Sequence, residues 1–385
     1  MAGKLATQKA TEAFDTIVDF LESFESLDDP RQRGKVLYPL DEVLLLVLLG
    51  VIAGCESWVE IARYGEKKLA LLRRFRPFKD ETPSHDQLGD IFAVLDAEQF
   101  QTCFVAWVTS LTGLGPEIIA IDGKTLRRSY QEGGAKAPIH MVSAWSAGQN
   151  MVLGQVKVAD KSNEITAIPR LLDMLTIKGA VVTIDAMGCQ REIAAKIVEK
   201  EADYVLALKG NQGTLRDDVE EFFTEQKANK YTDCKPSFHQ TLEKSHGRIE
   251  TRTVTVVGDI DWLKERHGWA GLASIVRVEC SREIAGKSER ESRFYITSLP
   301  ACAERIGLAI RGHWGIENGL HWVMDMVFRD DECRIRKNNA PANFATIKHM
   351  ASNLLRQAPG KDSLRVKRKV AAWDDDYLAT IIAKK

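Results

Sequence analysis

The stretch VVTIDAMGCQRE, residues 181–192, decides how the fold is understood. An apolar run ends at Asp185, small residues follow, and the segment from Gln190 is typical of a helix start. An aspartate in this position is often a turn former or a helix N-cap, because its side chain accepts backbone N–H groups. The alternative is a metal ligand at the carboxyl end of a central strand, where open α/β sheets place their sites. The rest of the chain has to decide between the two.

Length and composition indicate a sizeable folded protein. The chain has 385 residues, 44% of them hydrophobic and 28% charged, which favours a globular protein of two or three domains. A formal net charge of -1 argues against a uniformly basic surface, but not against local basic patches. The seven cysteines are scattered and form no Cys-x2-Cys pair, so neither a disulfide framework nor a zinc knuckle is indicated.

Residues 1–15 contain no apolar segment typical of a signal peptide. The most apolar run, residues 43–55, would span ~20 Å as a helix, short of the ~30 Å hydrocarbon core of a membrane. We therefore expect a buried core helix, a cytoplasmic location and no membrane partner.

Periodicity divides the chain into four segments. Residues 1–114 have apolar positions at helical spacing and predict an all-helical unit, either a DNA-binding or dimerising domain or a plain bundle. Residues 115–212 predict the order β-β-β-α-β-α-β, which favours a mixed sheet, antiparallel first and parallel after. Residues 213–292 predict a β-rich insertion. Residues 293–385 predict a return to a strand, a long helix over 304–328, a further helix and a basic tail.

Three acidic residues stand out in this arrangement. Asp122 ends the first predicted strand, Asp185 ends the fourth, and Glu317 lies on the long late helix. The first and fourth strands can lie side by side, which would bring the two aspartates together, and a helix across the sheet can supply Glu317. Converging carboxylates repel each other unless cations neutralise them, and oxygen-only ligands favour Mg²⁺ or Mn²⁺. Two such ions roughly 3.5–4 Å apart can catalyse an in-line phosphoryl displacement.

The chain resembles the bacterial insertion-sequence transposases that carry a DDE triad on a ribonuclease H-like fold, and more narrowly the branch of H-repeat-associated proteins. The combination of matching stretches covers most of the chain and is highly specific, whereas a single piece such as DGKT is not. The matching stretches are IAIDGKTLRRS, HMVSAW, KSNEITAIPRLL, VTIDAMGCQ, DYVLALKGNQ, SHGRIETR, RGHWGIENGLHWVMDMVFRDD and NNAPANFATIKHMASNLLR.

This resemblance implies an α/β fold: a ribonuclease H-like mixed sheet flanked by helices, with a β-rich insertion and an all-helical N-terminal accessory domain. It implies that Asp122, Asp185 and Glu317 form the catalytic triad and hold two Mg²⁺ or Mn²⁺ ions. It also implies cleavage at the terminal repeats of a mobile element, attack of the freed 3′-hydroxyl on target DNA, and a homodimer in the active complex.

The chain departs from the better-known branch of these transposases, which has a Tyr-x2-Arg-x3-Glu-x6-Lys pattern around the glutamate. Here those positions hold Ile310, His313, Glu317 and Met324. The phosphate-contacting roles of that arginine and lysine therefore cannot be carried over to this chain.

Polar residues near the three acids are candidates for DNA contact. A solvated charge cluster or an ordinary Gly-Asn turn would explain several of them equally well. The candidates are Lys124, Arg127, Arg128, Lys209, Asn211, Gln212, Arg311, His313 and His321, with Asp325 as a possible neighbour of the metal ligands.

Other chemistry explains the sequence less well. Histidines and acids recur every fourth residue on the late helix, but the HExxH pattern of many zinc enzymes is absent. Two locally basic stretches, residues 63–79 and 365–369, could contact DNA through counterion release or could be ordinary surface charge. Two other functions stay open: a metal-dependent nuclease without strand transfer, and an inactive or domesticated DNA-binding protein.

Overall fold

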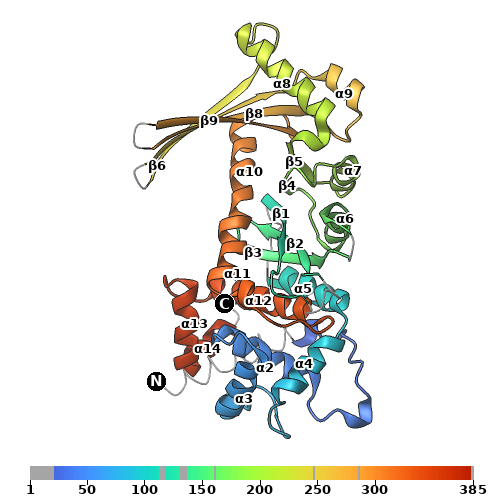
Figure 1. The fold of residues 1–385 in the computed structure, drawn as a ribbon, viewed down its shortest axis with the longest axis vertical. Helices are drawn as coiled ribbons and strands as arrows, with labels where there is room; N and C mark the ends of the chain where they lie inside the picture. The colour runs from blue at the N-terminus through green and yellow to red at the C-terminus, as the bar shows by residue number, and fades with distance from the viewer. Residues whose placement is uncertain are drawn as a thin grey trace.

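The computed structural model describes residues 21–111, 118–130, 137–159, 162–245, 248–284 and 287–382. The strands in these ranges are β1 (Ile118–Thr125), β2 (His140–Ser146), β3 (Met151–Lys157), β4 (Val181–Ile184), β5 (Asp203–Leu208), β6 (Ser237–Ser245), β7 (Arg248–Val257), β8 (Ser274–Ile284) and β9 (Lys287–Thr297). They form one sheet in the order β3-β2-β1-β4-β5-β9-β8-β7-β6. Figure 1 shows the first five strands in the middle of the molecule, the last four at its upper end and a helical unit at its lower end.

The first five strands form the mixed sheet that the sequence predicts. β1, β2 and β3 are antiparallel neighbours, and β4 and β5 continue the sheet in parallel with β1. The pairing of β1 with β4 ends at Ile121 opposite Ile184, so Asp122, within β1, and Asp185, directly after β4, are the next residues along the two chains. Asp122 does not end β1, however, because antiparallel pairing with β2 continues to Thr125.

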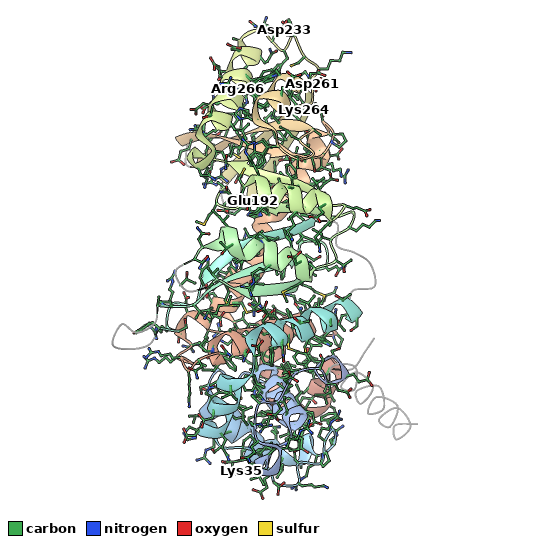
Figure 2. All side chains as sticks on the ribbon, turned by 90° about the vertical axis from the view of Figure 1, so that its right-hand side faces the viewer. Lys35, Glu192, Asp233, Asp261, Lys264 and Arg266 are labelled. Carbon is green, nitrogen blue, oxygen red and sulfur yellow. The ribbon has the colours of Figure 1, made fainter. Side chains whose placement is uncertain are left out.

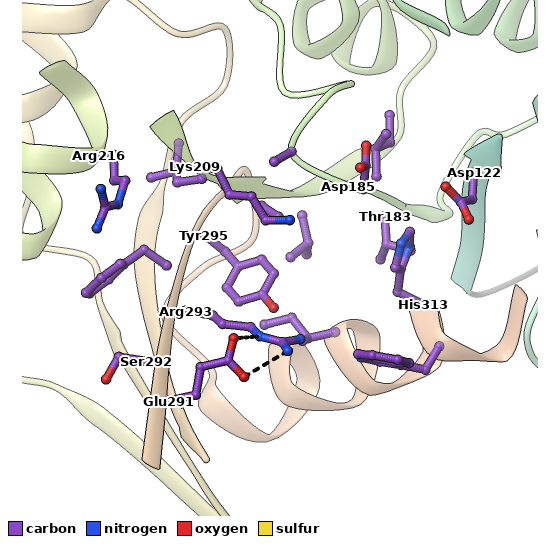
Figure 3. Close-up of a pocket in the computed structure, with 18 of the residues that line it drawn as sticks. Asp122, Thr183, Asp185, Lys209, Arg216, Glu291, Ser292, Arg293, Tyr295 and His313 are labelled. Atoms are coloured by element: carbon purple, nitrogen blue, oxygen red, sulfur yellow. Dashed lines mark hydrogen bonds and ion pairs between the residues drawn. The ribbon is translucent and has the colours of Figure 1, made fainter. Parts of the chain in front are cut away.

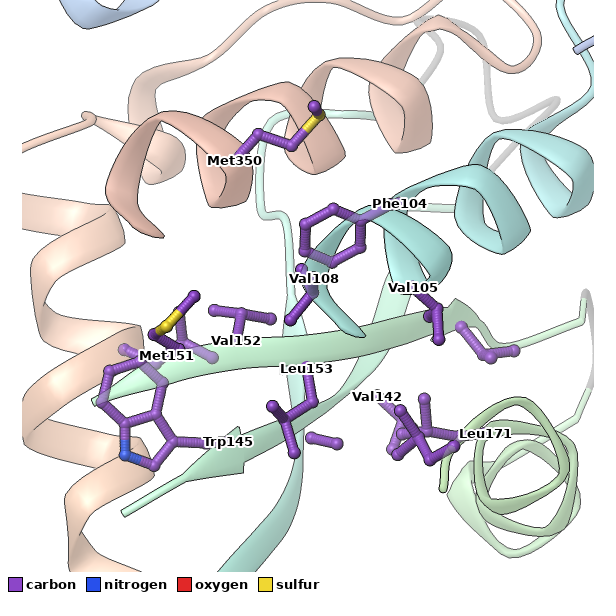
Figure 4. Packing of buried hydrophobic residues seen from close by; sticks show 14 of the residues in the cluster. Phe104, Val105, Val108, Val142, Trp145, Met151, Val152, Leu153, Leu171 and Met350 are labelled. Atoms are coloured by element: carbon purple, nitrogen blue, oxygen red, sulfur yellow. The ribbon is translucent and has the colours of Figure 1, made fainter. Parts of the chain in front are cut away.

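Helices cover the core sheet through apolar contacts. In Figure 4, Phe104 and Val108 of one helix and Met350 of another lie close to Val152 of β3, and all four are buried. On another side of these strands, Leu171 lies beside Val142 of β2. The covering helices are α5 (Ala97–Leu111), α6 (Glu164–Met174), α7 (Arg191–Glu199) and α12 (Ala340–Gln357).

The β-rich segment extends the core sheet instead of forming a separate layer. β9 pairs antiparallel with β5, and β8, β7 and β6 follow outward. Helices α8 (Gly213–Ala228) and α9 (Asp261–His267) lie over this extension. Strands β6, β7 and β8 lie within the segment 213–292 that was predicted to be β-rich, although the sequence of β6, SFHQTLEKS, has few apolar positions. Figure 2 labels Asp233, Asp261, Lys264 and Arg266 in the extension, Glu192 beside the core sheet and Lys35 at the opposite end.

Helices from the two ends of the chain pack into one helical unit. Besides α12, this unit contains α2 (Leu40–Ile52), α3 (Trp58–Leu72), α4 (His85–Val94), α13 (Leu364–Trp373) and α14 (Asp375–Ile382). α12 contacts α2, α4, α5, α13 and α14. Every residue of α2 from Glu42 to Ile52 is buried, which confirms the predicted core helix. Residues 1–20 and 112–114 of the predicted helical unit lie outside the described residues.

The two basic stretches make many of their contacts within this helical unit. In the first, Lys68 forms an ion pair with Asp375 of α14, at 2.7 Å. In the second, Lys367 and Arg368 are buried and donate hydrogen bonds to backbone carbonyls, those of Arg368 including the carbonyl of Val51 in α2. The prediction that the second stretch lies on the surface is therefore wrong for these two side chains, because they fasten α13 to the rest of the unit.

No single helix within the described ranges is long and apolar enough to cross a membrane. α4 and α5 would meet that test only as a pair, by length and composition, and they are bent by 90° relative to each other.

Candidate active site

The long helix predicted over residues 304–328 is present, but it is not a uniform α-helix. It consists of α10 (Ala303–Gly315), a π-helical segment (Ile316–His321) and α11 (Trp322–Met326). The N–H of Trp322 donates to the carbonyl of Glu317, a bond that spans five residues instead of four. π-Helical turns occur frequently at functional sites. Here the turn contains Glu317, the acid that the sequence analysis singled out.

The π-helical segment lies directly against the core sheet. A Cβ atom added to Gly319 would be 2.8 Å from the ring of Trp145 in β2, closer than real Cβ contacts. Glycine at this position therefore permits an approach that a larger residue would prevent. The close approach brings the segment next to β1, which carries Asp122.

Asp122, Glu317 and His321 form a compact group of potential ligands. One ligand atom from each lies within 4.8 Å of the other two. Nδ1 of His321 is 3.5 Å from Oδ2 of Asp122 and 3.4 Å from Oε2 of Glu317. Asp122 and His321 are largely buried, whereas 52% of the Glu317 side chain is exposed. Two carboxylates and an imidazole at these distances can bind a divalent cation.

Asp185 lines the same cavity as Asp122 and Glu317, a space of about 630 Å³. Its Oδ1 accepts hydrogen bonds from the N–H groups of Met187, at 3.0 Å, and Gly188, at 3.3 Å. Figure 3 shows Asp122 on β1 and Asp185 on the segment directly after β4, at one end of the cavity. Asp185 therefore both stabilises a turn, by accepting backbone N–H groups, and faces the candidate site. It is not part of the compact group of Asp122, Glu317 and His321.

The carboxylate of Asp122 is largely buried, and no lysine or arginine among the described residues forms an ion pair with it. Burial raises the pKa of Asp122 to about 8, and the charges of Glu317 and Glu164 add to the effect. Among the described residues, no lysine or arginine forms an ion pair with Asp122 or Glu317. The nearest candidate in sequence, Lys124, contacts Asp325 instead. Within the described ranges these two carboxylates therefore have no lysine or arginine ion-pair partner, and their oxygen ligands fit a divalent cation.

Side-chain amides hold the turn that contains Asp185. Asn211 donates to the carbonyl of Ala186 at 2.6 Å, and Gln212 donates to that of Cys189 at 2.9 Å. Both were candidates for DNA contact, and the structure gives them an intramolecular role. They fasten the segment after β5 to the segment after β4, and so fix the position of Asp185.

Most of the other candidates for DNA contact also have partners within the chain. Lys124 donates to the carbonyl of His321 at 3.3 Å, besides contacting Asp325. His313 lies 3.0 Å from the Thr183 hydroxyl, measured from Nδ1, and burial lowers its pKa.

Three arginines and one lysine among the candidates are more accessible. Arg127 is 78% exposed and lies 3.5 Å from Asp331. Arg311 contacts Glu243 of β6 at 3.2 Å and is 48% exposed. Arg128 is exposed, and Lys209 is exposed and lines the cavity. These four side chains therefore differ from the other candidates in their exposure, although Arg127 and Arg311 also have acidic partners within the chain.

Sequence reasoning missed part of the cavity wall. Arg216, Arg293 and Tyr295 line the cavity from the β-rich extension, opposite the aspartates (Figure 3). The segment that begins at Arg293 was predicted as a strand, but its pairing with β5, which brings it to the site, has no local sequence signal. Arg293 makes two hydrogen bonds to Glu291, at 2.8 and 2.9 Å.

Comparisons of the sequence with known proteins agree on one family. Residues 113–354 match the family described as transposase DDE domain, and residues 21–108 match the one described as DDE_Tnp_1-associated. The "H repeat-associated putative transposase YhhI" of Escherichia coli strain K12 is 39% identical over 370 residues, 94% of this chain and 97% of that protein. The "Putative transposase YncI" of Escherichia coli O157:H7 is 40% identical over 375 residues, 96% of this chain and 95% of that protein. A solved structure of the piggyBac transposase synaptic complex with hairpin DNA aligns with 97% of this chain and 80% of its own, at a TM-score of 0.40 and 9% identity.

Proposed function

We propose that this chain, which belongs to the transposase DDE domain family and is a DNA transposase, cuts and joins DNA by metal-dependent chemistry at Asp122, Asp185 and Glu317. The observation that carries the proposal is the convergence of these acids from three elements distant in sequence. Ligand atoms of Asp122 and Glu317 lie within 4.8 Å of each other, and Asp185 lines the same cavity.

Asp122, Asp185 and Glu317 would hold two divalent cations, Mg²⁺ or Mn²⁺. Such ions, when bound, supply Lewis acidity that activates the attacking oxygen and stabilises the leaving oxygen of a phosphodiester. The raised pKa of Asp122 supports this assignment, because a cation would favour the ionised carboxylate that burial disfavours. The backbone N–H groups that bind Oδ1 of Asp185 hold this carboxylate at the end of β4.

The proposed reaction consists of two in-line displacements. In the first, a water oxygen attacks the phosphorus at the element end, the bond from phosphorus to the 3′-oxygen breaks, and a 3′-hydroxyl and a 5′-phosphate result. In the second, this 3′-hydroxyl attacks a target phosphodiester, whose own 3′-oxygen leaves. The first step consumes one water molecule and breaks one phosphoester bond. The second step breaks one phosphoester bond and forms another. Neither step needs a further co-reactant.

The accessible cations Arg127, Arg128 and Lys209 are proposed to contact DNA phosphates, which are the usual partners of exposed lysine and arginine in such proteins. Two copies of the chain are proposed to hold the two element ends. Light scattering of the protein bound to an end-containing DNA duplex tests this second point, and a single copy per complex would contradict it.

The test of the reaction uses a plasmid carrying the DNA that flanks this gene on both sides. With MgCl₂ or MnCl₂, the wild-type chain should cut at the element ends and produce joined products. Asp122→Asn, Asp185→Asn and Glu317→Gln should each abolish cleavage. Glu304→Gln, which changes an exposed acid in the first turn of α10, is the matched control and should stay active.

The outcomes separate the alternatives. Cleavage without joined products would identify a nuclease and contradict the second displacement. Metal-independent binding of the ends without cleavage would favour an inactive or domesticated DNA-binding protein. Full activity of any one triad variant would remove that residue from the proposed site.

A further inference from the structure

We infer that His321 is a ligand of one of the cations, through Nδ1, so that the site combines oxygen and nitrogen donors instead of oxygen alone. The inference rests on the proposed function, because it requires the cation site at Asp122 and Glu317. It goes beyond the triad by assigning a further ligand and, with it, a preference among metals.

The distances around His321 are those of a ligand set. Nδ1 lies 3.5 Å from Oδ2 of Asp122 and 3.4 Å from Oε2 of Glu317. Atoms bound to one ion at about 2.1 Å are separated by roughly 3.0 Å in an octahedron and roughly 3.4 Å in a tetrahedron. The imidazole therefore lies where a cation could bind it together with both carboxylates.

The polar contacts of the ring point to the site. His321 is 8% exposed, and the structure describes no hydrogen-bond partner for its other nitrogen, Nε2, which is buried. Within the described ranges, the recorded polar contacts of the imidazole are those of Nδ1 with Asp122 and Glu317. A buried imidazole held only by two carboxylates has the orientation that a metal ligand needs.

The backbone fixes this orientation. His321 and Glu317 are the last and second residues of the π-helical segment. Lys124, which neighbours Asp122 on β1, donates to the carbonyl of His321 at 3.3 Å. The π-helical turn and this hydrogen bond together hold both ligand-bearing residues against the strand that carries Asp122.

A nitrogen ligand changes which metal the site prefers. Carboxylates suit Mg²⁺ and Mn²⁺, whereas imidazole suits transition metals and binds Mg²⁺ poorly. The site is therefore expected to bind Mn²⁺ more tightly than Mg²⁺, and His321 is expected to contribute to that difference.

The experiment titrates the full-length, metal-free protein with MnCl₂ and with MgCl₂ in a calorimeter. The variant H321Q moves the polar atom away from the Nδ1 position and should weaken Mn²⁺ binding at least about tenfold, and Mg²⁺ binding less. The variant H321N keeps an oxygen near that position, so it should retain Mg²⁺ binding while losing the preference for Mn²⁺.

A second measurement detects a nitrogen ligand directly. Pulsed electron paramagnetic resonance of the Mn²⁺-loaded wild-type protein should show coupling to a ¹⁴N nucleus, and H321N should lose it. Circular dichroism melting of each variant shows whether it is folded.

The outcomes distinguish this inference from the proposed function. Absence of ¹⁴N coupling in the wild-type protein, or equal Mn²⁺ affinity in H321Q and the wild type, would overturn the role of His321. If D122N still binds Mn²⁺ as tightly as the wild type, the cation site itself is wrong. If D122N loses Mn²⁺ and H321Q does not, only the inference fails.

Discussion

Two buried aspartates of this protein have opposite surroundings. Asp330 is 4% exposed and lies 2.7 Å from Lys348, which is 1% exposed. Burial alone would lower the pKa of Lys348, but Asp330, Cys333 and Glu56 together outweigh burial and raise that pKa. Asp122 is also largely buried, yet it faces Glu317, and burial raises its pKa to about 8. A buried acid paired with a buried base serves the fold, whereas a buried acid that faces another acid is a candidate for function.

The largest effect is expected where the pair of Asp330 and Lys348 is broken. Asp330→Asn leaves the Lys348 ammonium buried without its counter-charge, which should cost about 3–5 kcal/mol of unfolding free energy. Urea unfolding followed by circular dichroism measures this loss. Combining Asp330→Leu with Lys348→Met removes both charges and should restore most of the stability. If Asp330→Asn is as stable as the wild type, the ion pair does not stabilise the fold, and the contrast drawn between Asp330 and Asp122 fails.

Metal ions should stabilise the site of Asp122 and leave the pair at Asp330 unchanged. At a cation concentration of 100 times the dissociation constant, the unfolding free energy should rise by about 2.7 kcal/mol. Asp122→Asn should remove this gain, since it removes a ligand, whereas Glu304→Gln should keep it. Thermal unfolding with EDTA and with MnCl₂ makes the measurement. Equal stabilisation of the wild type and Asp122→Asn would place the cation elsewhere.

Without metal, Asp122 should make stability depend on pH in a defined direction. Its pKa is raised from 3.8 to about 8 in the folded protein, so the folded state binds the proton more tightly than the unfolded state. The stabilisation is therefore complete below about pH 4 and is lost as the pH rises through about 8. Asp122→Asn cannot ionise, so in EDTA at pH 8 it should be more stable than the wild type, and the difference should disappear below about pH 4. A less stable variant would contradict the account of an uncompensated acid.

The core of the site could be predicted from the sequence because it depends on local signals. Apolar runs ending in Asp122 and Asp185 indicate strands, the strand order follows from the β-β-β-α-β pattern, and the structure shows the two strands as neighbours. The position of Glu317 on a helix was also predicted. These features require only periodicity and the rules of sheet topology.

The partners of individual side chains could not be predicted, because they come from distant parts of the chain. Lys124 contacts Asp325, 201 residues later, and so was taken for a phosphate contact. His313, Glu317 and His321 are four residues apart, a spacing that predicts one polar stripe on a regular helix. The π-helical turn changes the register within that stripe, and it depends on packing against Trp145 instead of on local sequence.

The smallest expected effect tests that packing directly. In Gly319→Ala, the new Cβ would lie 2.8 Å from the Trp145 ring, so the π-helical segment or the ring must shift. Overpacking costs about 1–3 kcal/mol, but alanine gains about 1 kcal/mol over glycine in a helix, so the net loss of stability should be about 1 kcal/mol. The matched control is Gly213→Ala at the start of α8, where nothing lies within 4 Å of the added Cβ, and it should not lose stability. Because the segment carries Glu317 and His321, Gly319→Ala should also weaken Mn²⁺ binding, which Gly213→Ala should not. Unchanged Mn²⁺ affinity together with lower stability would mean that the close approach to β2 serves the fold alone, as the pair of Asp330 and Lys348 does.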